Sequence, residues 1–538
     1  MKTIIKTGVS VLALSLAGAA MAQSNTSDVE QTGVTEEATV GQSGSGTNTS
    51  DIDQDGSNNE ATVTQTSVAG DTNSSTIEQA VGSADNSATV DQIGEGNVSD
   101  ILQEGEDGTV TVTQDGTDND SMVEQDSSAS LLGGATTNVD QTGNDNFSTV
   151  MQVGAAVLTN VTQNNSDTAA AGNDSAVVQM ADGAIVNVDQ DGQGNISSVT
   201  QSGALAVVGV EQDGDANDSF INQTGDGAII SVVQDGTGND SDVTQSASGA
   251  NVSVDQFGTT NRSTVQQAGA GVGVTIDQDG TSNLSVVDQA AGGSTISVTQ
   301  NGVENDSLVF GIAEGSDVTV NQFGGDRNEA TVSQFDADQQ GTGPNPLCFG
   351  PFFCPGGPTI TVTLPVLNEN QSASITQNGS DNTASIAQYG RNQIATINQI
   401  GEGNFAGPTQ RPTTADPVGI LQVGENQTAN LTQSGNGNSS LIEQGTDGDF
   451  FLLTGAASDG NTANVTQNGD GGQSTVEQNG DDNLATLLQV DGGIGNISAI
   501  SQAGNSNIAN VSQGGNGDMS DVSQNGNGNS AIVSQNMP

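Results

Sequence analysis

The sequence is short of the residues from which most binding and catalytic sites are built. It has no histidine and no tryptophan, one tyrosine, and only 2% aromatic residues in a chain of 538. The commonest general base and metal ligand is therefore missing, and few rings are left to stack on sugars or bases. Its scattered acidic residues are better explained as surface charge than as general acids. We expect no enzyme active site and no cofactor.

Positive charge is nearly absent as well. Six lysines and arginines stand against 65 acidic residues, which gives a formal net charge of −59. Such a field disfavours nucleic acid and anionic membranes as partners. Hydrophobic residues make up only 32% of the chain, too few for an ordinary large globular core. Composition alone would predict disorder.

The first residues form an export signal. Lys2 and Lys6 precede an apolar run from Val9 to Ala17, and the small-residue sequence Ala20-Met21-Ala22 follows. This order predicts a secretory signal peptide over residues 1–22. The apolar run is too short to span a bilayer, and no second candidate follows. We expect a secreted protein, extracellular or on the cell surface, with no transmembrane segment.

Cysteine occurs twice, at Cys348 and Cys354 within LCFGPFFCPGG. In an exported protein this spacing predicts a small local disulfide. A redox or metal site would need a closer pair or further ligands, and no histidine is there to supply one.

An eleven-residue period overrides the expectation of disorder. From Gln179 to Gln300 a glutamine recurs at every eleventh residue. The fullest units read Q-x-G-x-x-N-x-[SA]-x-[VIL]-x-Q, in which asparagine, serine or alanine, an aliphatic residue and glutamine lie two apart. Residues spaced by two share one face of a β-strand. The x-G-x-x segment supplies a tight turn, where glycine accepts a positive φ.

Polar and aliphatic strands alternate between positions 179 and 300, so the full repeat there is two units long and two strands make one rung. The pattern predicts an all-β protein, a β-solenoid of stacked strand-turn-strand rungs with amyloid-like cross-β order. Stacking at about 4.8 Å would align each inward side chain with its counterpart two units away. The expected ladder residues are Asn217, Ser219, Ile221, Gln223, Asn239, Ser241, Val243, Gln245, Asn261, Ser263, Val265 and Gln267. The expected turn glycines are Gly214, Gly236, Gly258 and Gly280.

Interruptions of the period define the domain organisation. A first repeat block covers residues 23–334, and a segment rich in proline, cysteine and phenylalanine follows at 335–370. A second block covers 371–538, with loop insertions near 407–419 and 446–461. We expect each interruption to leave the solenoid as an excursion.

Acidic residues recur in the turns at every second unit, as at Asp191, Asp213 and Asp235. Stacking would bring like charges together and oppose assembly. One hypothesis is that protonation, salt or divalent cations relieve the repulsion and promote growth. The alternative, equally open, is a solvated acidic surface that keeps the protein soluble.

The repeat unit resembles that of the curlin family, the subunits of bacterial curli fibres. It recurs over most of residues 31–535, as in QIGEGNVSDILQ ending at Gln103 and QNGNGNSAIVSQ ending at Gln535. The resemblance implies a secreted functional amyloid that supports biofilm matrix and adhesion. It also implies self-association into fibres, with a minor nucleating subunit and an outer-membrane secretion machinery as further partners.

The chain departs from usual members of that family in two ways. The resemblance implies about five rungs and a glycine-rich segment after the signal, whereas here the repeats begin by Gln31 and make roughly twenty rungs. We see no capping segment after the last strand, Asn529 to Gln535, and expect end-to-end growth. The alternative is a long solenoid that does not polymerise and serves as an adhesin or a fibre nucleator.

Overall fold

The protein consists of β-strands and turns in a computed structural model, which describes residues 24–68, 72–126, 134–165, 171–311, 313–335, 370–406, 419–445 and 458–536. No helix occurs within these ranges. The expected signal peptide and the pair Cys348 and Cys354 lie outside the described residues, as does most of the expected 335–370 insertion. The chain divides into two compact units, residues 1–259 and 260–538. Each is described by itself.

In the first unit, strands belong alternately to two sheets, called sheet A and sheet B. Sheet A contains β1 (Thr26–Val34), β3 (Thr47–Ser57), β5 (Thr72–Ala84), β7 (Val98–Glu104), β9 (Asp120–Asp126), β11 (Phe147–Val153), β13 (Asp174–Gln179), β15 (Ile196–Gln201), β17 (Asp218–Gln223) and β19 (Asp240–Gln245). Sheet B contains β2 (Glu37–Gly44), β4 (Glu60–Ser67), β6 (Ser87–Glu95), β8 (Thr109–Thr117), β10 (Thr136–Asn144), β12 (Leu158–Asn165), β14 (Ile185–Gln193), β16 (Val207–Asp215), β18 (Ile229–Thr237) and β20 (Asn251–Thr259).

The second unit repeats this alternation. Its sheet A contains β21 (Arg262–Gln267), β23 (Leu284–Gln289), β25 (Asp306–Gly311), β27 (Glu329–Phe335), β29 (Thr383–Arg391), β31 (Phe405–Ala406), β32 (Ile420–Glu425), β34 (Ser439–Gln444), β35 (Ser458–Asp459), β37 (Gln473–Asn479), β39 (Ile497–Ala503) and β41 (Met519–Asn525). Its sheet B contains β22 (Gly273–Thr281), β24 (Thr295–Val303), β26 (Asp317–Phe323), β28 (Ser372–Asn378), β30 (Ile394–Ile400), β33 (Thr428–Ser434), β36 (Thr462–Asp470), β38 (Leu484–Ile494), β40 (Ile508–Gln513) and β42 (Ser530–Gln535).

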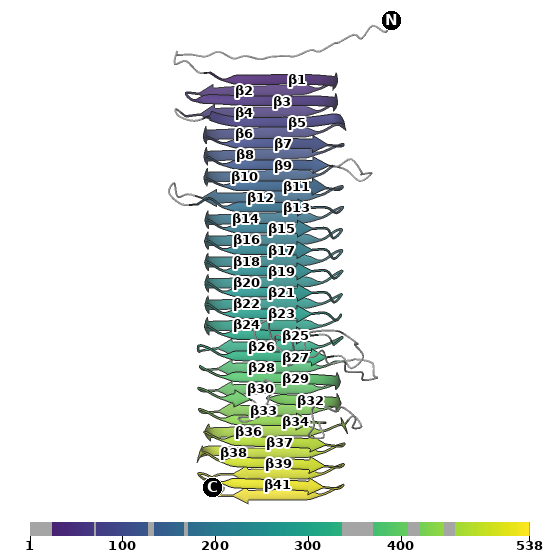
Figure 1. Cartoon of the computed structure of the whole chain (residues 1–538), viewed down its shortest axis with the longest axis vertical. Helices are drawn as coiled ribbons and strands as arrows, with labels where there is room; N and C mark the ends of the chain where they lie inside the picture. The colour runs from purple at the N-terminus through teal and green to yellow at the C-terminus, as the bar shows by residue number, and fades with distance from the viewer. Residues whose placement is uncertain are drawn as a thin grey trace, which may run out of the picture. The chain divides into compact units, whose positions relative to one another are not determined.

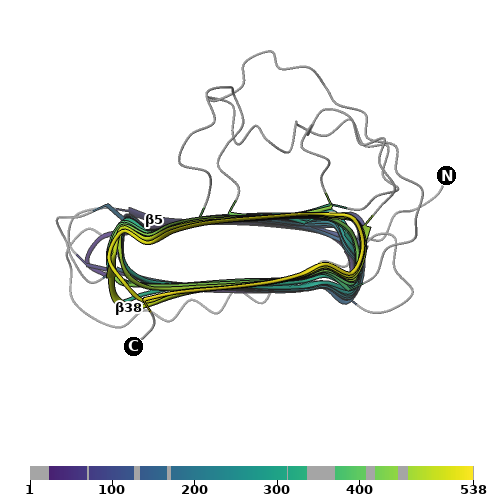
Figure 2. The same cartoon turned by 90° about the horizontal axis from the view of Figure 1, so that it is seen from below.

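Strands within each sheet pair in parallel and in register. Ile185 pairs with Val207, Val207 with Ile229 and Ile229 with Asn251, each partner lying two repeat units further along the chain. Figure 1 shows the strands of each unit stacked in this way, and Figure 2 shows, within each unit, two flat sheets joined by turns. The predicted fold class, a β-solenoid of stacked strand-turn-strand rungs, is confirmed.

Strand parity decides which side chains are buried. In β20 Val252 and Val254 are buried, while Asn251 is exposed and Ser253 partly so. Each rung thus contributes a few aliphatic residues to a thin core between its two sheets. One rung buries too little to offset its ordering entropy, so stability resides in the contacts between rungs.

The interruptions leave the register intact. β27 pairs with β29, so that Phe335 is the backbone partner of Tyr389 on the far side of the expected insertion. At the second interruption Ala406 pairs with Ala384, and the Gly419 N–H donates to the Ser385 carbonyl at 2.9 Å. β31 and β32 therefore both pair with β29 and together take the place of one strand in sheet A. Residues 407–418, which lie outside the described part, connect them in sequence.

Parity fails at one place on the outer side of sheet A. Ala387, Leu421 and Val423 form a buried cluster with Tyr389 packed against it, although all four have outward parity. Burial raises the pKa of the Tyr389 phenol. The repeat pattern alone predicts exposed residues at these positions. The burial extends along the same column to Ser333 on β27 and Glu443 on β34, so it covers strands before and after the interruption at 407–418.

Candidate assembly interface

Buried glutamines in sheet B form a continuous amide ladder. In the first unit it runs through nine side-chain hydrogen bonds of 2.7–2.9 Å, each from Nε2 to Oε1 of the next rung. Its members are Gln42, Gln65, Gln92, Gln114, Gln141, Gln163, Gln190, Gln212, Gln234 and Gln256. The second hydrogen of Nε2 bonds to the opposite sheet: Gln212 of sheet B donates it to the Ile196 carbonyl of sheet A at 2.9 Å. The ladder therefore joins rung to rung and sheet to sheet.

The glutamine ladder of sheet A is interrupted. It runs from Gln31 to Gln201 with distances of 2.7–3.1 Å. Gln201 Nε2 and Gln223 Oε1 are then buried without a hydrogen-bond partner, and Gln223 Nε2 donates instead to the Gly225 carbonyl. Gln223 differs in this from the expected ladder. Gln289 likewise donates to the Ala291 carbonyl, and Gly311 takes the glutamine position of the next rung.

Asparagines at the turn from sheet B to sheet A form a different kind of ladder. Asn217 Oδ1 accepts the backbone N–H of Asn239 at 3.0 Å, while Asn217 Nδ2 donates to the carbonyls of Asp213 and Gly236 at 3.2 and 3.3 Å. The bonds run mainly from side chain to backbone, and they satisfy groups that the turn would leave unpaired. The amide therefore holds the turn in shape as well as linking rungs.

The structure places all twelve predicted ladder residues inside. Each side chain is at most 2% exposed. Ser219 Oγ is buried without a partner. Alanine occupies the same column elsewhere, for example Ala330 opposite Ser307. Small size therefore suffices at this position.

The four predicted turn glycines have positive φ: 109° at Gly214, 128° at Gly236, 111° at Gly258 and 130° at Gly280. Stacking adds a second requirement, because a Cβ on Gly214 would lie 2.1 Å from the Gly236 carbonyl oxygen. Both the backbone conformation and the approach of the next rung require glycine here.

Acidic side chains stack on the outer faces. Asp191, Asp213 and Asp235 occupy successive positions of one column. Beside them burial, with the charges of Glu211, Asp191 and Asp213, raises the pKa of Asp189. Among the described residues no group of three or more acidic or thiol side chains is arranged to hold a metal ion. The columns bring like charges close together, and protonation of the carboxylates would weaken the repulsion between them.

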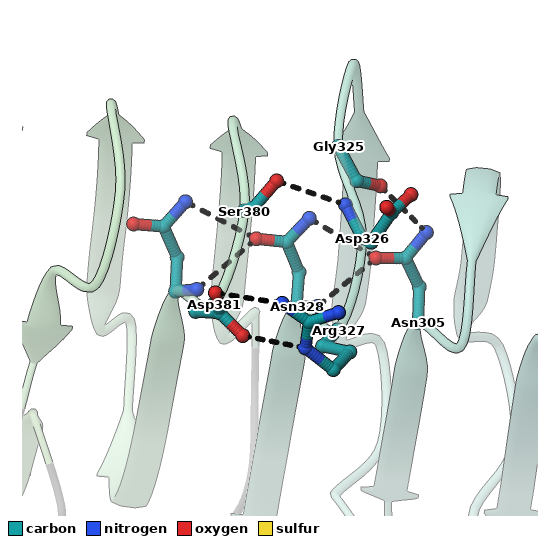
Figure 3. A network of polar contacts seen from close by, with 8 residues as sticks. Asn305, Gly325, Asp326, Arg327, Asn328, Ser380 and Asp381 are labelled. Atoms are coloured by element: carbon teal, nitrogen blue, oxygen red, sulfur yellow. Dashed lines mark hydrogen bonds and ion pairs between the residues drawn. The ribbon is translucent and has the colours of Figure 1, made fainter.

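The asparagine ladder continues where the chain is interrupted, as Figure 3 shows around Asn328. Asn328 donates to Asn305 Oδ1 from its backbone N–H and from Nδ2, both at 3.0 Å. Beyond the expected insertion, Asn382 donates to Asn328 Oδ1 from the same two groups, at 3.2 and 3.1 Å. On the surface Arg327 makes two bonds to Asp381, at 2.7 and 2.9 Å. Sequence reasoning missed this pair, because the two residues lie on opposite sides of the expected 335–370 insertion. The stacked turns bring them together.

The strands of the first and last rungs of the described chain pair on one side only. In the first unit β1 and β2 pair with β3 and β4, and in the second unit β41 and β42 pair with β39 and β40. The inward residues of these two edge rungs match position by position. Ser27, Val29, Gln31, Ala38, Val40 and Gln42 correspond to Ser520, Val522, Gln524, Ala531, Val533 and Gln535.

No helix of the described residues is long and apolar enough to cross a membrane.

In comparisons with known proteins, a family model for the Curlin associated repeat matches residues 47–80, 84–116, 273–302, 369–410 and 459–490. The matches fall in both units and confirm the resemblance seen in the repeat pattern. No curated protein matches the chain.

Proposed function

Because the chain is a curlin-repeat protein, we propose that it is a structural subunit of an extracellular curli-type fibre, which grows by adding copies end to end. The match between the two edge rungs carries this proposal. A second copy placed with β1 on β41 and β2 on β42 would continue each inward column of the strands with the same residue type. In the two turn columns Asn25 would follow Asp518 and Glu36 would follow Asn529. Such edges template further strands.

The amide ladders give the junction its direction. Where the ladders are intact, each glutamine donates Nε2 to the glutamine of the following rung, as Gln502 donates to Gln524 at 2.8 Å. Gln524 and Gln535 already donate once, to the carbonyls of Ile508 and Met519. Their second hydrogens would meet Oε1 of Gln31 and Gln42 in the next copy. The fibre would be polar, with every copy oriented alike.

A structural role in biofilm matrix and adhesion follows from this proposal. The curlin repeat is a structural family and not an enzymatic one. The extracellular location is supported by the predicted signal peptide and by the family resemblance. The second candidate is a single long solenoid that acts as an adhesin or nucleator, and the buried, ladder-bonded core of each unit favours it because a core of this kind is complete without a partner.

Seeded growth of the mature protein tests the proposal. Val533→Lys places a charge on the inward side of the edge strand, whereas Ser534→Lys places the same charge on its outward side. We expect Val533→Lys to slow seeded thioflavin fluorescence growth at least tenfold and Ser534→Lys to slow it by less than twofold. Equal rates for the two variants, or a lasting monomer at pH 4.5 and moderate salt, would contradict fibre growth. A lasting monomer would favour the adhesin.

Divalent cations enter the proposal as promoters of assembly. The stacked column Asp191, Asp213 and Asp235 would be bridged by calcium beyond simple screening. Lag times measured with and without calcium at constant ionic strength separate the two effects. A shorter lag with calcium supports bridging, and equal lags leave a solvated acidic surface.

A further inference from the structure

The outer face of sheet A in the first unit carries a set of large apolar side chains on neighbouring strands. From β7 to β17 the exposed ones are Val98, Met122, Phe147, Ile196 and Phe220, with 40–47% of each surface accessible. Strand pairing joins these rungs without a gap. Five of six adjacent rungs therefore present a large apolar side chain on a strongly acidic protein, and exposed faces of this kind mark contact sites.

Bulky and short residues alternate along this face. One column of paired residues reads Val98, Asp120, Phe147, Asp174, Ile196 and Asp218. The neighbouring column has Met122 between Asp100 and Thr149. Its second bulky residue, Phe220, follows Ser198. In the first column ridges and gaps recur with a period of two rungs, or about 9.6 Å. In the second column the ridges Met122 and Phe220 stand two such periods apart, with Thr149, Ala176 and Ser198 between them.

We propose that this face, defined by Val98, Met122, Phe147, Ile196 and Phe220, is a lateral contact between copies of this chain. A second copy has ridges at the same spacing. Displaced by one rung, it would place Met122 opposite a short residue such as Thr149, and Phe220 opposite Ser198. Neither a lipid surface nor an irregular polypeptide has this period.

The size of the face predicts that the contact is weak in single molecules. Six rungs and three outward residues per strand span about 24 by 13 Å, or about 300 Å². Stable dimers bury about 800 Å² on each partner. Copies stacked end to end would repeat the face and multiply its effect. The lateral contact depends on the proposed fibre only for this increase in binding strength.

The aspartates between the ridges make the contact sensitive to pH. Burial raises the pKa of Asp120, Asp174 and Asp218, with Asp100 adding to the effect at Asp120 and Asp240 at Asp218. Other acids on the strands beside these aspartates are Glu104 on β7, Glu124 and Asp126 on β9, and Asp242 on β19. No charged side chain of β11 or β15 faces Asp174. Protonation would remove the repulsion between copies, so the contact forms on acidification.

Fibre width separates the lateral contact from growth. The variant Phe147→Ser/Ile196→Ser/Phe220→Ser is compared with Ile229→Ser/Ile394→Ser/Ile400→Ser, which removes residues of equal exposure, 45–49%, from sheet B. At pH 4.5 we expect the first variant to lower the fraction of bundled fibres in electron micrographs at least fivefold and to leave the seeded growth rate unchanged. Bundling that persists, or that falls equally in the control, overturns the proposal.

A gain-of-function variant gives the opposite test. Asp120→Asn/Asp174→Asn/Asp218→Asn should allow bundling at pH 7.5, whereas the charge-matched control Asp91→Asn/Asp140→Asn/Asp255→Asn on sheet B should not. Equal bundling in both contradicts the assignment. If no fibres form, sedimentation velocity of the unassembled chain at pH 4.5 decides. Concentration-dependent association that the serine variant reduces at least fivefold supports the contact, and a monomer at all concentrations, or adsorption to zwitterionic lipid vesicles instead, overturns it.

Discussion

The two turns of one rung differ in the inward residue that each holds and in the state of the glutamine ladder beside it. In β14 to β20 the turn from sheet B to sheet A holds a buried asparagine such as Asn217, and the glutamine ladder next to it in sheet B is unbroken. The opposite turn holds Ala228 or Ala250 at the equivalent position, and the ladder in sheet A is lost between Gln201 and Gln223.

The difference has a physical cause in the turn carbonyls. At the asparagine turn Asn217 Nδ2 donates to the carbonyl of Gly236 in the following turn. Alanine has no such donor, and at the other turn Gln223 Nε2 bonds the Gly225 carbonyl itself. In this orientation Gln223 makes no hydrogen bond to Gln201 or to the glutamine of the following rung. Alanine in the turn permits this bond but does not force it, since Gln179 precedes the turn that holds Ala184 and still donates to Gln201 at 2.9 Å.

The strongest test of this comparison removes one glutamine from each ladder. Gln212→Leu deletes a side chain that accepts from Gln190 and donates to Gln234, both at 2.8 Å, and it leaves buried groups unpaired. We expect a loss of about 3 kcal/mol in local stability, against about 1 kcal/mol for Gln223→Leu. Hydrogen exchange of peptides across β14 to β18 at pH 7.5 measures both. Equal losses would show that the ladder bonds of Gln212 add no stability beyond the contacts of Gln223.

The next test removes the turn amide. Asn217→Ala deletes the acceptor of the Asn239 N–H and the donor to Asp213 and Gly236, and it should cost about 2 kcal/mol by the same exchange measurement. The control is Asn187→Ala, an exposed asparagine on the outer face, for which we expect less than about 0.5 kcal/mol. A cost for Asn187 as large as for Asn217 would show that burial is not the deciding factor.

A third test concerns the acidic residue that directly follows the asparagine of the turn, Asp218 at the start of β17. Burial, with the neighbouring charge of Asp240, raises the pKa of Asp218. Since the folded chain then holds this proton at a higher pH than the unfolded chain, stability is full below the ordinary aspartate pKa and falls as pH rises through the raised value. We expect Asp218→Asn to stabilise β17 by about 0.5 kcal/mol at pH 7.5 and to have no effect at pH 3.5. A stabilisation independent of pH would point to another cause.

The smallest effect is expected inside the same strand. Ser219→Ala removes a buried hydroxyl that has no partner, and alanine already fits this column at Ala330 and Ala384. We expect a change within about 0.5 kcal/mol, neutral or stabilising. Protection factors of β17 and β19 measured side by side provide the comparison with Asn217→Ala. A loss near that of Asn217 would mean that the hydroxyl is bonded in solution.

Period and parity were enough to predict the solenoid, its inward residues and its turn glycines, because the alternation along a strand fixes the face and the repeat length fixes the partner. They could not show that Gln223 turns away from its ladder, since that depends on which carbonyl lacks a donor. They also missed the buried outer cluster of Leu421 and Val423 and the ion pair of Arg327 with Asp381. These depend on residues that fall out of the repeat.

The uninterrupted register at β27 and β29 has a practical consequence. Ser307 and Ala330 are paired through an ordinary rung, whereas Ala330 and Ala384 are paired across the much longer connection that contains positions 336–369. Each doubling in the length of a flexible connection costs only about 0.6 kcal/mol in closure entropy. A rung therefore accepts a long foreign peptide nearly as readily as its own turn. The solenoid is therefore suited to grafting, because a peptide can be inserted at a chosen rung.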